Sequence, residues 1–216
     1  MNTTKIVAVT NPLVDGVKSA DEFIAYTARV SNPSNQMNSE TAEKLLKYCI
    51  RNKHFSIFEM VNVVMEVTTT RDIARQILRH RSFSFQEFSQ RYADPTKDLG
   101  FVSREARLQD VKNRQNSIET TNKNLKEDWE MRQMAVRDLV SEVYEWAIEN
   151  GIAKEQARVV LPEGLTLSRM YMNGTLRSWI HYCELRMANG TQREHQLVAE
   201  SAWQEIGKYF TFLTRE

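Results

Sequence analysis

Hydrophobic and polar positions alternate along some stretches of the N-terminal half and recur every three to four residues along others. Alternation in segments rich in valine and threonine is typical of strands, and the longer period is typical of helices. Ser19 and Glu22 form a capping-box pattern, which marks the start of a helix. We therefore expect strands over residues 5–10 and 60–70 and helices over residues 19–30, 40–51 and 71–81.

The C-terminal half contains a long polar stretch that the N-terminal half lacks. Residues 109–128 supply few apolar side chains, so we expect an exposed helical insertion there. Apolar positions then recur at helical spacing over residues 125–147, and Asn150-Gly151 would end that helix. The remaining pattern, with a second capping box over residues 191–194, predicts a strand over residues 166–172 and helices over residues 175–187 and 191–212.

These elements predict an α/β (α+β) fold in which a mixed sheet packs against a helical portion. Hydrophobic residues make up 41% and charged residues 26% of the 216 residues, which is the usage of a soluble globular protein. A chain of this length suits a single domain. We expect that domain to span residues 1–216, with a polar helical arm at about residues 103–150, called the arm below.

Charge and cysteine content argue against several classes of protein. A net charge of +1 gives no global field that would favour nucleic acid or a membrane surface. The sequence contains no run of about 18 apolar residues and no signal-peptide pattern, so we expect a cytoplasmic protein without a membrane partner. Cys49 and Cys183 show neither disulfide nor metal-ligand spacing. We expect two buried, reduced thiols and no metal.

Polar side chains are concentrated between residues 71 and 91, where five arginines occur. Gln76, Arg79 and His80 are spaced to share one face of the expected helix. Glu87, Ser89 and Arg91 follow with a spacing of two, which an extended segment would aim in one direction. Guanidinium and hydroxyl groups suit a phosphate monoester, and a carboxylate suits sugar hydroxyls or a base. A solvated helix face is the alternative interpretation of these residues.

Several segments resemble one enzyme family. Arg79-His80-Arg81, followed after seven residues by Ser89, resembles the RHR-x7-S signature of flavin-dependent thymidylate synthases. The resemblance covers most of residues 20 to 205, except the arm. Further matching segments are His54 with Ser56 and Glu59, then Ala157–Pro162, Asn173–Trp179, Leu185-Arg186 and Gly190–Gln192.

The resemblance implies a homotetramer with shared active sites that bind dUMP and FAD. The residues implied around dUMP are Gln76, Arg79, Glu87, Ser89, Gln90, Arg91, Arg158 and Arg186. Those implied around FAD are Ser56, Arg79, His80, Arg81, Glu87, Thr175, Arg177 and His181, with His54 controlling access of folate or flavin. Either Asn173 or Thr175 would be the polar contact to FAD. Gln90 stands where the family often has glycine, which requires a negative φ at that position.

The resemblance also implies the reaction, which is methylation of dUMP to dTMP. Carbon would come from 5,10-methylenetetrahydrofolate and hydride from FAD reduced by NADPH, so that tetrahydrofolate leaves. Arg186 would be catalytic, because a guanidinium near O2 and N3 of the pyrimidine stabilises negative charge on the ring. Neither cysteine has neighbours that lower a thiol pKa. Ser89 as a nucleophile is the alternative, although no histidine is placed in sequence to activate it.

Helix geometry gives an independent expectation for residues 175–187. At about 100° per residue, Arg177 and His181 lie roughly 40° apart and Arg186 lies about opposite Arg177. Leu176, Ile180, Cys183 and Met187 would fill the stripe between them.

Two other functions compete with the enzyme. The arginines between residues 71 and 91 and the phenylalanines Phe83, Phe85 and Phe88 would suit a sequence-neutral nucleic-acid-binding domain, although core packing is the simpler use of the phenylalanines. A nucleotide sensor without catalytic activity would use the same residues as the enzyme. His195 has no partner pattern, and we expect it to be structural.

Overall fold

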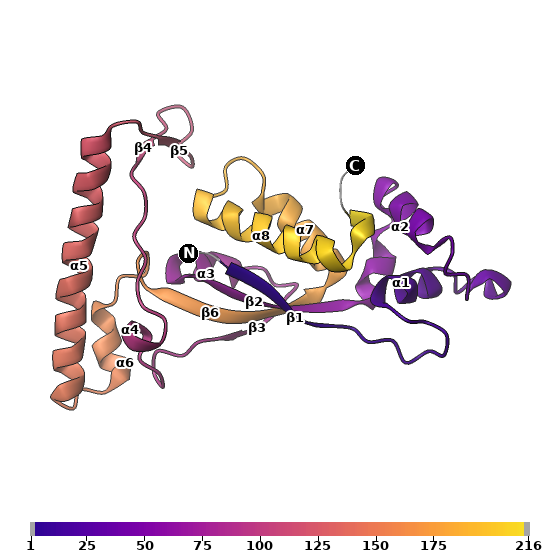
Figure 1. Cartoon of the computed structure of the whole chain (residues 1–216), viewed down its shortest axis with the longest axis horizontal. Coiled ribbons are helices and arrows are strands. Elements are labelled where there is room, and N and C mark those ends of the chain that lie inside the picture. Colours follow the sequence, from indigo (N-terminus) through magenta and orange to yellow (C-terminus); the bar gives the residue numbers. More distant parts are fainter. Residues whose placement is uncertain (1–2, 214–216) are drawn as a thin grey trace.

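Four antiparallel strands form the main sheet, in the order β1-β2-β6-β3 (Figure 1). The structure, a computed structural model, describes residues 3–213. The strands are β1 (Thr3–Val9), β2 (Asn62–Thr70), β6 (Leu167–Thr175) and β3 (Ser84–Glu87). β2 and β6 pair over nine residues, from Asn62 opposite Thr175 to Thr70 opposite Leu167. The expected mixed sheet is wrong, because every pairing in the described sheet is antiparallel.

α7 (Leu176–Arg186) and α8 (Arg193–Tyr209) cover one face of this sheet, and the main core lies beneath them (Figure 1). Three other helices add residues to the same core. They are α1 (Ala20–Ala28), α2 (Ala42–Arg51) and α3 (Arg71–Ile77), and α1 and α2 do so beyond one end of the sheet (Figure 1). Alternate residues of β2 point into the core, where Val63 and Met65 are buried. The Trp179 indole Nε1 donates to the Val63 carbonyl over 3.0 Å. The α+β class is therefore confirmed.

Short helices complete the connections between the longer elements. The α-helical pieces are α4 (Pro95–Asp98) and α6 (Lys154–Ala157). The 3-10 pieces are η1 (Pro33–Asn35), η2 (Phe55–Met60), η3 (Arg158–Val160) and η4 (Thr211–Leu213).

The helix expected over residues 71–81 ends at Ile77. Beyond it, turn hydrogen bonds join the His80 amide to the Ile77 carbonyl and the Phe83 amide to the His80 carbonyl. The chain turns here because Phe83 enters the core and residues 84–87 pair with β6. A Cβ on Gly174 would lie 2.5 Å from Phe83 Cδ1, so only glycine leaves room for this ring.

The capping box expected at residues 191–194 is also wrong. α8 begins at Arg193 with Gln192 as its N-cap, and no side chain caps it. The Gln192 amide is used elsewhere, since it donates to Glu194 and accepts from Gln76.

The arm begins with a β-hairpin instead of the expected helix. Its strands are β4 (Arg107–Gln109) and β5 (Ser117–Glu119). The Asp110 carboxylate accepts from the backbone N–H groups of Lys112 and Asn113, and these local bonds compete with a helix. The long helix α5 (Lys123–Glu149) follows, with Asn122 as its N-cap. It ends at Asn150, followed by Gly151 at φ 75°, as the sequence predicts.

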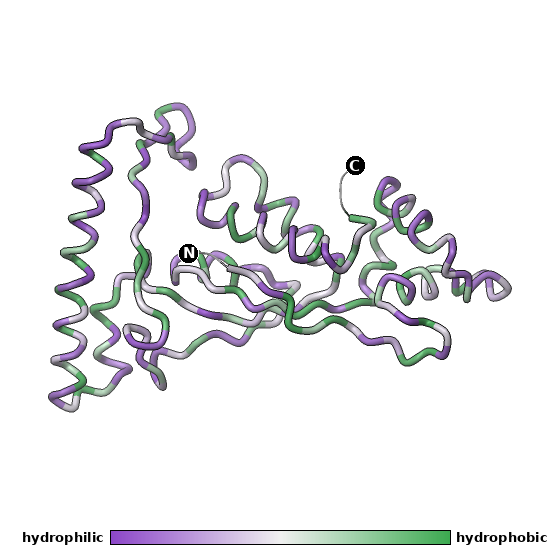
Figure 2. The backbone as a smooth tube through the Cα atoms, in the orientation of Figure 1, coloured by the Kyte–Doolittle hydropathy of each residue, from purple (hydrophilic) through white to green (hydrophobic). Residues whose placement is uncertain are grey.

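α5 is attached to the rest of the chain at few points. The Gln133 amide donates to the Arg104 carbonyl and accepts from the Arg104 N–H, each over 2.8 Å. A small second core joins α5 to α6 and to the segment after it, and consists of Tyr144, Ala147, Ala157 and Leu161. Green and purple positions mix along the whole of α5 in Figure 2, and several of the apolar ones are exposed. Those exposed at helical spacing on one side, called the α5 stripe below, are Trp129, Val136, Leu139, Val143 and Trp146.

Candidate active site

Two strand-to-helix junctions direct polar side chains toward one another over the covered face of the sheet. Because β2 and β6 are antiparallel, α3 leaves one end of the pair and α7 leaves the other, and both lie on the same side of the sheet (Figure 1). The chain just beyond α3 therefore reaches the end of α7. There the Arg186 guanidinium donates from Nε to His80 Nε2 over 2.8 Å. Two predicted site residues 106 positions apart are thus in direct contact.

The contact requires a neutral His80. Nε2 accepts a hydrogen bond, so the proton of the neutral ring is on Nδ1. Partial burial, together with the positive charges of Arg186, His181 and Arg79, lowers the pKa of His80 to about 4. The side chain of Arg186 is thereby fixed through Nε, which leaves its two terminal nitrogens for a ligand.

Gln76, on α3, contacts residues that the sequence did not predict for the site. Its Nε2 donates to Gln192 Oε1 over 2.8 Å, and its Oε1 lies 3.2 Å from His195 Nδ1. His195 is fully buried, as expected of a structural residue, yet it contacts a predicted site residue. No local pattern around His195 could have shown this contact, because its partner is 119 residues away.

A cavity of about 450 Å³ lies beside the first turns of α7. Arg177 and His181 both line it, in agreement with the angle between them that helix geometry predicts. Glu59, from η2, also lines it and binds the Arg177 Nη1 and the Thr175 hydroxyl, each over 2.8 Å. Thr175 therefore lies at this cavity through Glu59, whereas Asn173 is exposed within β6. The role of Glu59 as a link between these residues was missed, although it belongs to a segment that the resemblance includes.

The buried stripe of α7 is close to the one predicted. Leu176, Ile180 and Cys183 are buried, and Met187 packs partly buried against the same core. The prediction omitted Trp179 and Tyr182, which are also buried.

The expected extended run through Glu87, Ser89 and Arg91 is only partly correct. β3 ends at Glu87, and the Tyr92 amide bonds to the Ser89 carbonyl over 3.1 Å, so Ser89 and Arg91 lie in a turn. They are not aligned with Glu87. The turn forms where β3 loses its pairing with β6, beyond Glu87 opposite Met170.

Glu87 is held by Arg71, which belongs to the arginine cluster, and by Ser168, which was not singled out from the sequence. Its Oε1 accepts from the Ser168 hydroxyl over 2.7 Å and lies 3.4 Å from Arg71 Nη1. Both partners are distant in sequence, so spacing gives no signal for them. Their contacts engage one carboxylate oxygen and fix the direction of the other.

A second group of predicted residues gathers near α6. Arg91 Nη2 is 3.2 Å from the Glu155 carboxylate, and Arg158 Nε donates to the Glu155 carbonyl over 3.3 Å. Gln90 is buried, its Nε2 has no hydrogen-bond partner in the described chain, and its φ is negative, as expected. No hydrogen bond or ion pair within residues 3–213 joins this group to His80 and Arg186.

The remaining predicted residues face solvent. His54, Ser56, Arg79 and Arg81 are exposed. The guanidinium groups of Arg79 and Arg81 form no hydrogen bond or ion pair within the described residues, so they are available to a ligand or a second chain. The His54 ring lies edge-on to Tyr48, with centroids 5.9 Å apart.

Comparison with known proteins identifies the family. A family model described as thymidylate synthase complementing protein matches residues 12–210. A protein of Paramecium bursaria Chlorella virus 1 named "probable flavin-dependent thymidylate synthase" is 50% identical over 213 residues, covering 99% of this chain and 97% of its own. The chain belongs to the flavin-dependent thymidylate synthase family.

A second relative agrees with that identification, and a solved structure shows the same fold. A flavin-dependent thymidylate synthase of Synechocystis is 47% identical over 209 residues, covering 95% of this chain and 94% of its own. The crystal structure of the UMP/dUMP methylase PolB from Streptomyces cacaoi, bound with 5-Br dUMP, superposes with a TM-score of 0.76. It is 24% identical and covers 98% of this chain and 93% of its own, so it shows the same fold.

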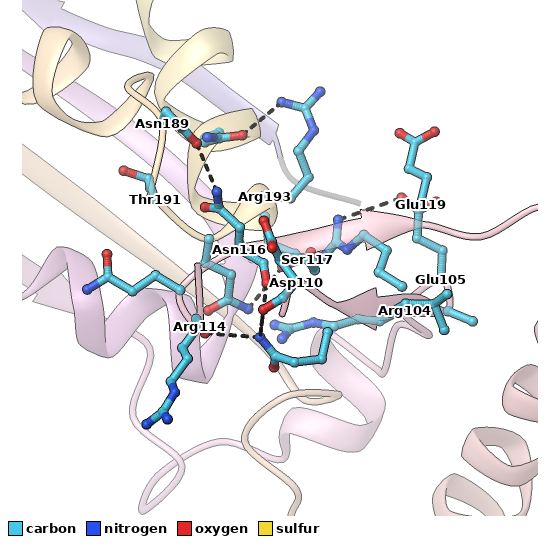
Figure 3. Close-up of a pocket in the computed structure, with 18 of the residues that line it drawn as sticks. Arg104, Glu105, Asp110, Arg114, Asn116, Ser117, Glu119, Asn189, Thr191 and Arg193 are labelled. Carbon is cyan, nitrogen blue, oxygen red and sulfur yellow. Dashed lines mark hydrogen bonds and ion pairs between the residues drawn. The ribbon is translucent and has the colours of Figure 1, made fainter. Parts of the chain in front are cut away.

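The larger cavity of this family member was not predicted from the sequence. It measures about 810 Å³ and lies between the hairpin of the arm and the start of α8, where Asn116 bonds to Asn189 (Figure 3). Its charged side chains balance in number, with four arginines and four acids. They are Arg104, Arg107, Arg114, Arg193, Glu105, Asp110, Glu119 and Glu194.

The two thiols of this thymidylate synthase homologue are unsuited to nucleophilic attack. Cys49 and Cys183 are free and buried, as expected. Burial raises the pKa of both thiols, which disfavours the thiolate that would attack a pyrimidine. Within residues 3–213, no helix is long and apolar enough to cross a membrane.

Proposed function

We propose that the protein methylates dUMP to dTMP with 5,10-methylenetetrahydrofolate as carbon donor and FAD, reduced by NADPH, as hydride donor, releasing tetrahydrofolate. Membership of the flavin-dependent thymidylate synthase family supports the reaction class. One observation supports the assignment of roles to individual residues. Neutral His80 holds the Arg186 guanidinium beside the cavity that Arg177 and His181 line.

Arg186 is the catalytic residue on this proposal. With Nε bound to His80, its two terminal nitrogens can donate to O2 of uracil and place positive charge beside N3. Negative charge that forms on the pyrimidine is then stabilised by a cation already in place, which makes C5 a better nucleophile. No covalent bond to a cysteine is needed. Gln76 and Arg79 lie next to Arg186 and His80 in the chain's fold and bind the rest of the nucleotide.

The residues around the smaller cavity fit part of FAD. Arg177 and His181 suit a pyrophosphate, because a guanidinium and an imidazole can donate hydrogen bonds to its oxygens. Glu59 holds Arg177 and Thr175 in place. Bound FAD supplies the hydride once NADPH has reduced it. Ser56, Arg79, His80, Arg81 and Glu87 complete the FAD site, and His54 borders the entrance for folate.

The group near α6 binds the phosphate of dUMP. Glu155 contacts both Arg91 and Arg158. Glu87, Ser89 and Gln90 come just before Arg91 in the sequence. Two guanidinium groups and a hydroxyl suit a phosphate monoester. Because no described contact joins this group to Arg186 in one chain, we assign the two groups of each complete site to different subunits.

A homotetramer would bring these groups together. The α5 stripe supports assembly, because Leu139 is 61% and Trp146 58% exposed on one helix face. Apolar surface of this kind marks interaction sites. A second copy of the chain is the occupant that the shared active site requires.

Turnover and colour together test the function. The purified protein should absorb visible light as a flavoprotein and bleach with NADPH, and it should form dTMP from dUMP and methylenetetrahydrofolate. Arg186→Ala should keep its flavin and lose turnover by about 100- to 1000-fold, the range for one preorganised charge contact. Arg193→Gln removes a cation from α8 that pairs with Glu200, and it should leave turnover unchanged.

The outcomes separate the alternatives. A protein that binds dUMP without producing dTMP would be a sensor. Full activity of Arg186→Ala would refute the catalytic assignment.

A further inference from the structure

Two fully buried polar side chains lie directly beneath the proposed site and have no part in the mechanism above. They are Tyr182 on α7 and His195 on α8. The Tyr182 hydroxyl is 3.1 Å from His195 Nε2, and His195 Nδ1 is 3.2 Å from Gln76 Oε1. Buried polar groups cost free energy unless they are paired, so a buried chain of this kind constrains every member.

The direction of each hydrogen bond follows from chemistry. Gln76 Oε1 can only accept, so His195 Nδ1 carries the proton and donates. His195 Nε2 must then accept, and the Tyr182 hydroxyl donates to it. Burial and the positive charge of Arg186 lower the pKa of His195 to about 3, which keeps the ring neutral with this single proton.

The chain continues from Gln76 to the arm. Gln76 Nε2 donates to Gln192 Oε1 over 2.8 Å, and Gln192 Nε2 donates to Glu194 Oε2 over 2.9 Å. Arg107, in β4, forms an ion pair with the other oxygen of Glu194. Burial alone would raise the pKa of Glu194, but hydrogen bonds and the charges of Arg104 and Arg107 lower it, so the carboxylate is ionised.

This arrangement prevents the Gln76 amide from rotating. If the amide turned over, its oxygen would face Gln192, which would have to turn as well. The Gln192 oxygen would then face the ionised oxygen of Glu194, and two acceptors would oppose each other. The carboxylate that Arg107 anchors therefore fixes which side of Gln76 carries N–H. One N–H and one lone pair of Gln76 remain unused in the chain.

Gln76 and Arg186 are held by neighbouring rings. The His80 ring packs edge-on against Tyr182 with centroids 4.9 Å apart, and the His195 ring is 5.8 Å from Tyr182. Thus one tyrosine supports both the histidine that binds Arg186 and the histidine that binds Gln76. If Arg186 takes O2 and N3 of the pyrimidine, the polar atom of the base that remains for Gln76 is O4.

We propose that Tyr182 and His195 are positioning residues that hold the free N–H of Gln76 toward O4 of uracil, with Glu194 and Arg107 fixing its direction. This inference rests on the proposed function. It makes the hydrogen-bond chain a determinant of specificity, because cytosine has an amino group where uracil has O4. An N–H of Gln76 held in place would face that amino group and reject dCMP, as a buried unpaired donor does.

The test is calorimetric binding of dUMP and of dCMP to the flavin-loaded protein. Tyr182→Phe removes the hydroxyl bonded to His195 Nε2. The His195 ring is then held at one nitrogen only, so its contact with Gln76 loosens and the free N–H of Gln76 is less firmly placed. The preference for dUMP over dCMP should fall about tenfold, which corresponds to the loss of one net hydrogen bond. Tyr144→Phe is the matched control, since Tyr144 is equally buried but its hydroxyl has no partner in the described chain. It should leave the preference unchanged.

The other end of the chain gives an independent measurement. Arg107→Gln removes the anchor of Glu194 and should lower the same preference, whereas Arg193→Gln, beside it at the start of α8, should not. His195→Phe should lower the preference as Tyr182→Phe does. His195→Asn should recover part of it, because the asparagine amide can donate from near the position of Nδ1.

The outcomes distinguish the two proposals. If Tyr182→Phe and Arg107→Gln bind flavin and keep the full preference for dUMP, the positioning role is refuted while the proposed function stands. If the unaltered protein neither binds dUMP nor converts it, the proposed function itself is refuted. Should His195→Phe fail to fold, the two other variants decide the question.

Discussion

The sheet with its covering helices and the arm use tryptophan in opposite ways. Trp179 of α7 is fully buried and donates a hydrogen bond to β2. Trp146 of α5 is 58% exposed and belongs to the α5 stripe. The first region satisfies its own apolar surface and holds Arg186, whereas the second presents apolar surface that one chain leaves uncovered. On the proposed function, the contact that holds the catalytic charge forms within one subunit, and the exposed α5 stripe serves to bring the second copy that completes the site.

Charges placed on the α5 stripe should break the assembly, which is the largest effect expected. Leu139→Glu with Val143→Glu would bury carboxylates in the interface, at a cost of several kcal/mol. About 4 kcal/mol corresponds to a 1000-fold weaker association. Sedimentation should show dissociation, with loss of turnover. Leu13→Glu with Val111→Glu adds the same charge at exposed positions outside the stripe and should remain assembled. An intact, active Leu139 and Val143 variant would contradict the role of the stripe.

The two tryptophans give the next largest contrast. Trp179→Ala should lower the free energy of unfolding by about 3–5 kcal/mol, because it leaves a cavity in the core. Trp146→Ala should change the unfolding free energy of the separated chain by less than about 0.5 kcal/mol, as exposed substitutions do. Urea denaturation of both in the dissociated background measures this. Equal losses would mean that the arm is part of the same cooperative core.

Two glycines sharpen the comparison at smaller magnitude. Gly174→Ala would place a Cβ 2.5 Å from the Phe83 ring, so the ring must move, at about 1–3 kcal/mol. Gly164→Ala, near the arm, would meet only Arg104 Nη1 at 3.9 Å. It should be close to neutral in thermal unfolding. A stable Gly174→Ala variant would show that Phe83 is not held in place by the core.

The smallest expected effect is the pH dependence contributed by His80. Its pKa is about 4 in the folded chain and about 6.5 in an unfolded one, so the unfolded chain binds the proton first as pH falls. The stability from neutral His80 is complete above pH 6.5 and decreases between pH 6.5 and 4. His80→Asn keeps an acceptor but cannot titrate, so it should lose less stability from pH 7 to pH 5.

The groups around His80 are the same in the unaltered protein and in His80→Asn, so the difference in stability lost between them isolates His80. These groups are His195, Arg79, His181 and Arg186. Denaturant midpoints at the two pH values give the measurement. On the same reasoning, the affinity for deoxyuridine, which has no phosphate that titrates in this range, should be flat from pH 8 to about pH 6. A midpoint near 6.5 in binding would mean that His80 is solvated and does not hold Arg186.

Sequence periodicity predicted the helices and strands that bury a single face. It missed features decided by contacts with distant residues or by local side-chain hydrogen bonds. The alternation of β2 and the spacing of α7 correspond to single buried faces, so both were predicted. The helix expected to reach Arg81 stops early because Phe83 must pack against Gly174, which lies far along the chain. The hairpin was missed because Asp110 forms local bonds that outweigh weak helical spacing.

The candidate site also has a part that the sequence predicted and a part that it did not. The residues of the RHR-x7-S signature were found by resemblance, and the structure brings Arg186 to His80. The side chains that orient them carry no local signal. His195 and Gln192 meet Gln76 only through the fold, over more than 100 residues of sequence. Their function depends on tautomer and amide direction, which a residue pattern does not contain.

Thr175 is both the last residue of β6 and the N-cap of α7, where its hydroxyl accepts from the Ser178 N–H over 3.2 Å. No linker separates the strand from the helix, so α7 cannot swing as a lid without tearing the sheet. Arg177, His181 and Arg186 therefore form a fixed wall of the site. On the proposed function, ligands would therefore enter and leave on the side of the site that a neighbouring subunit completes.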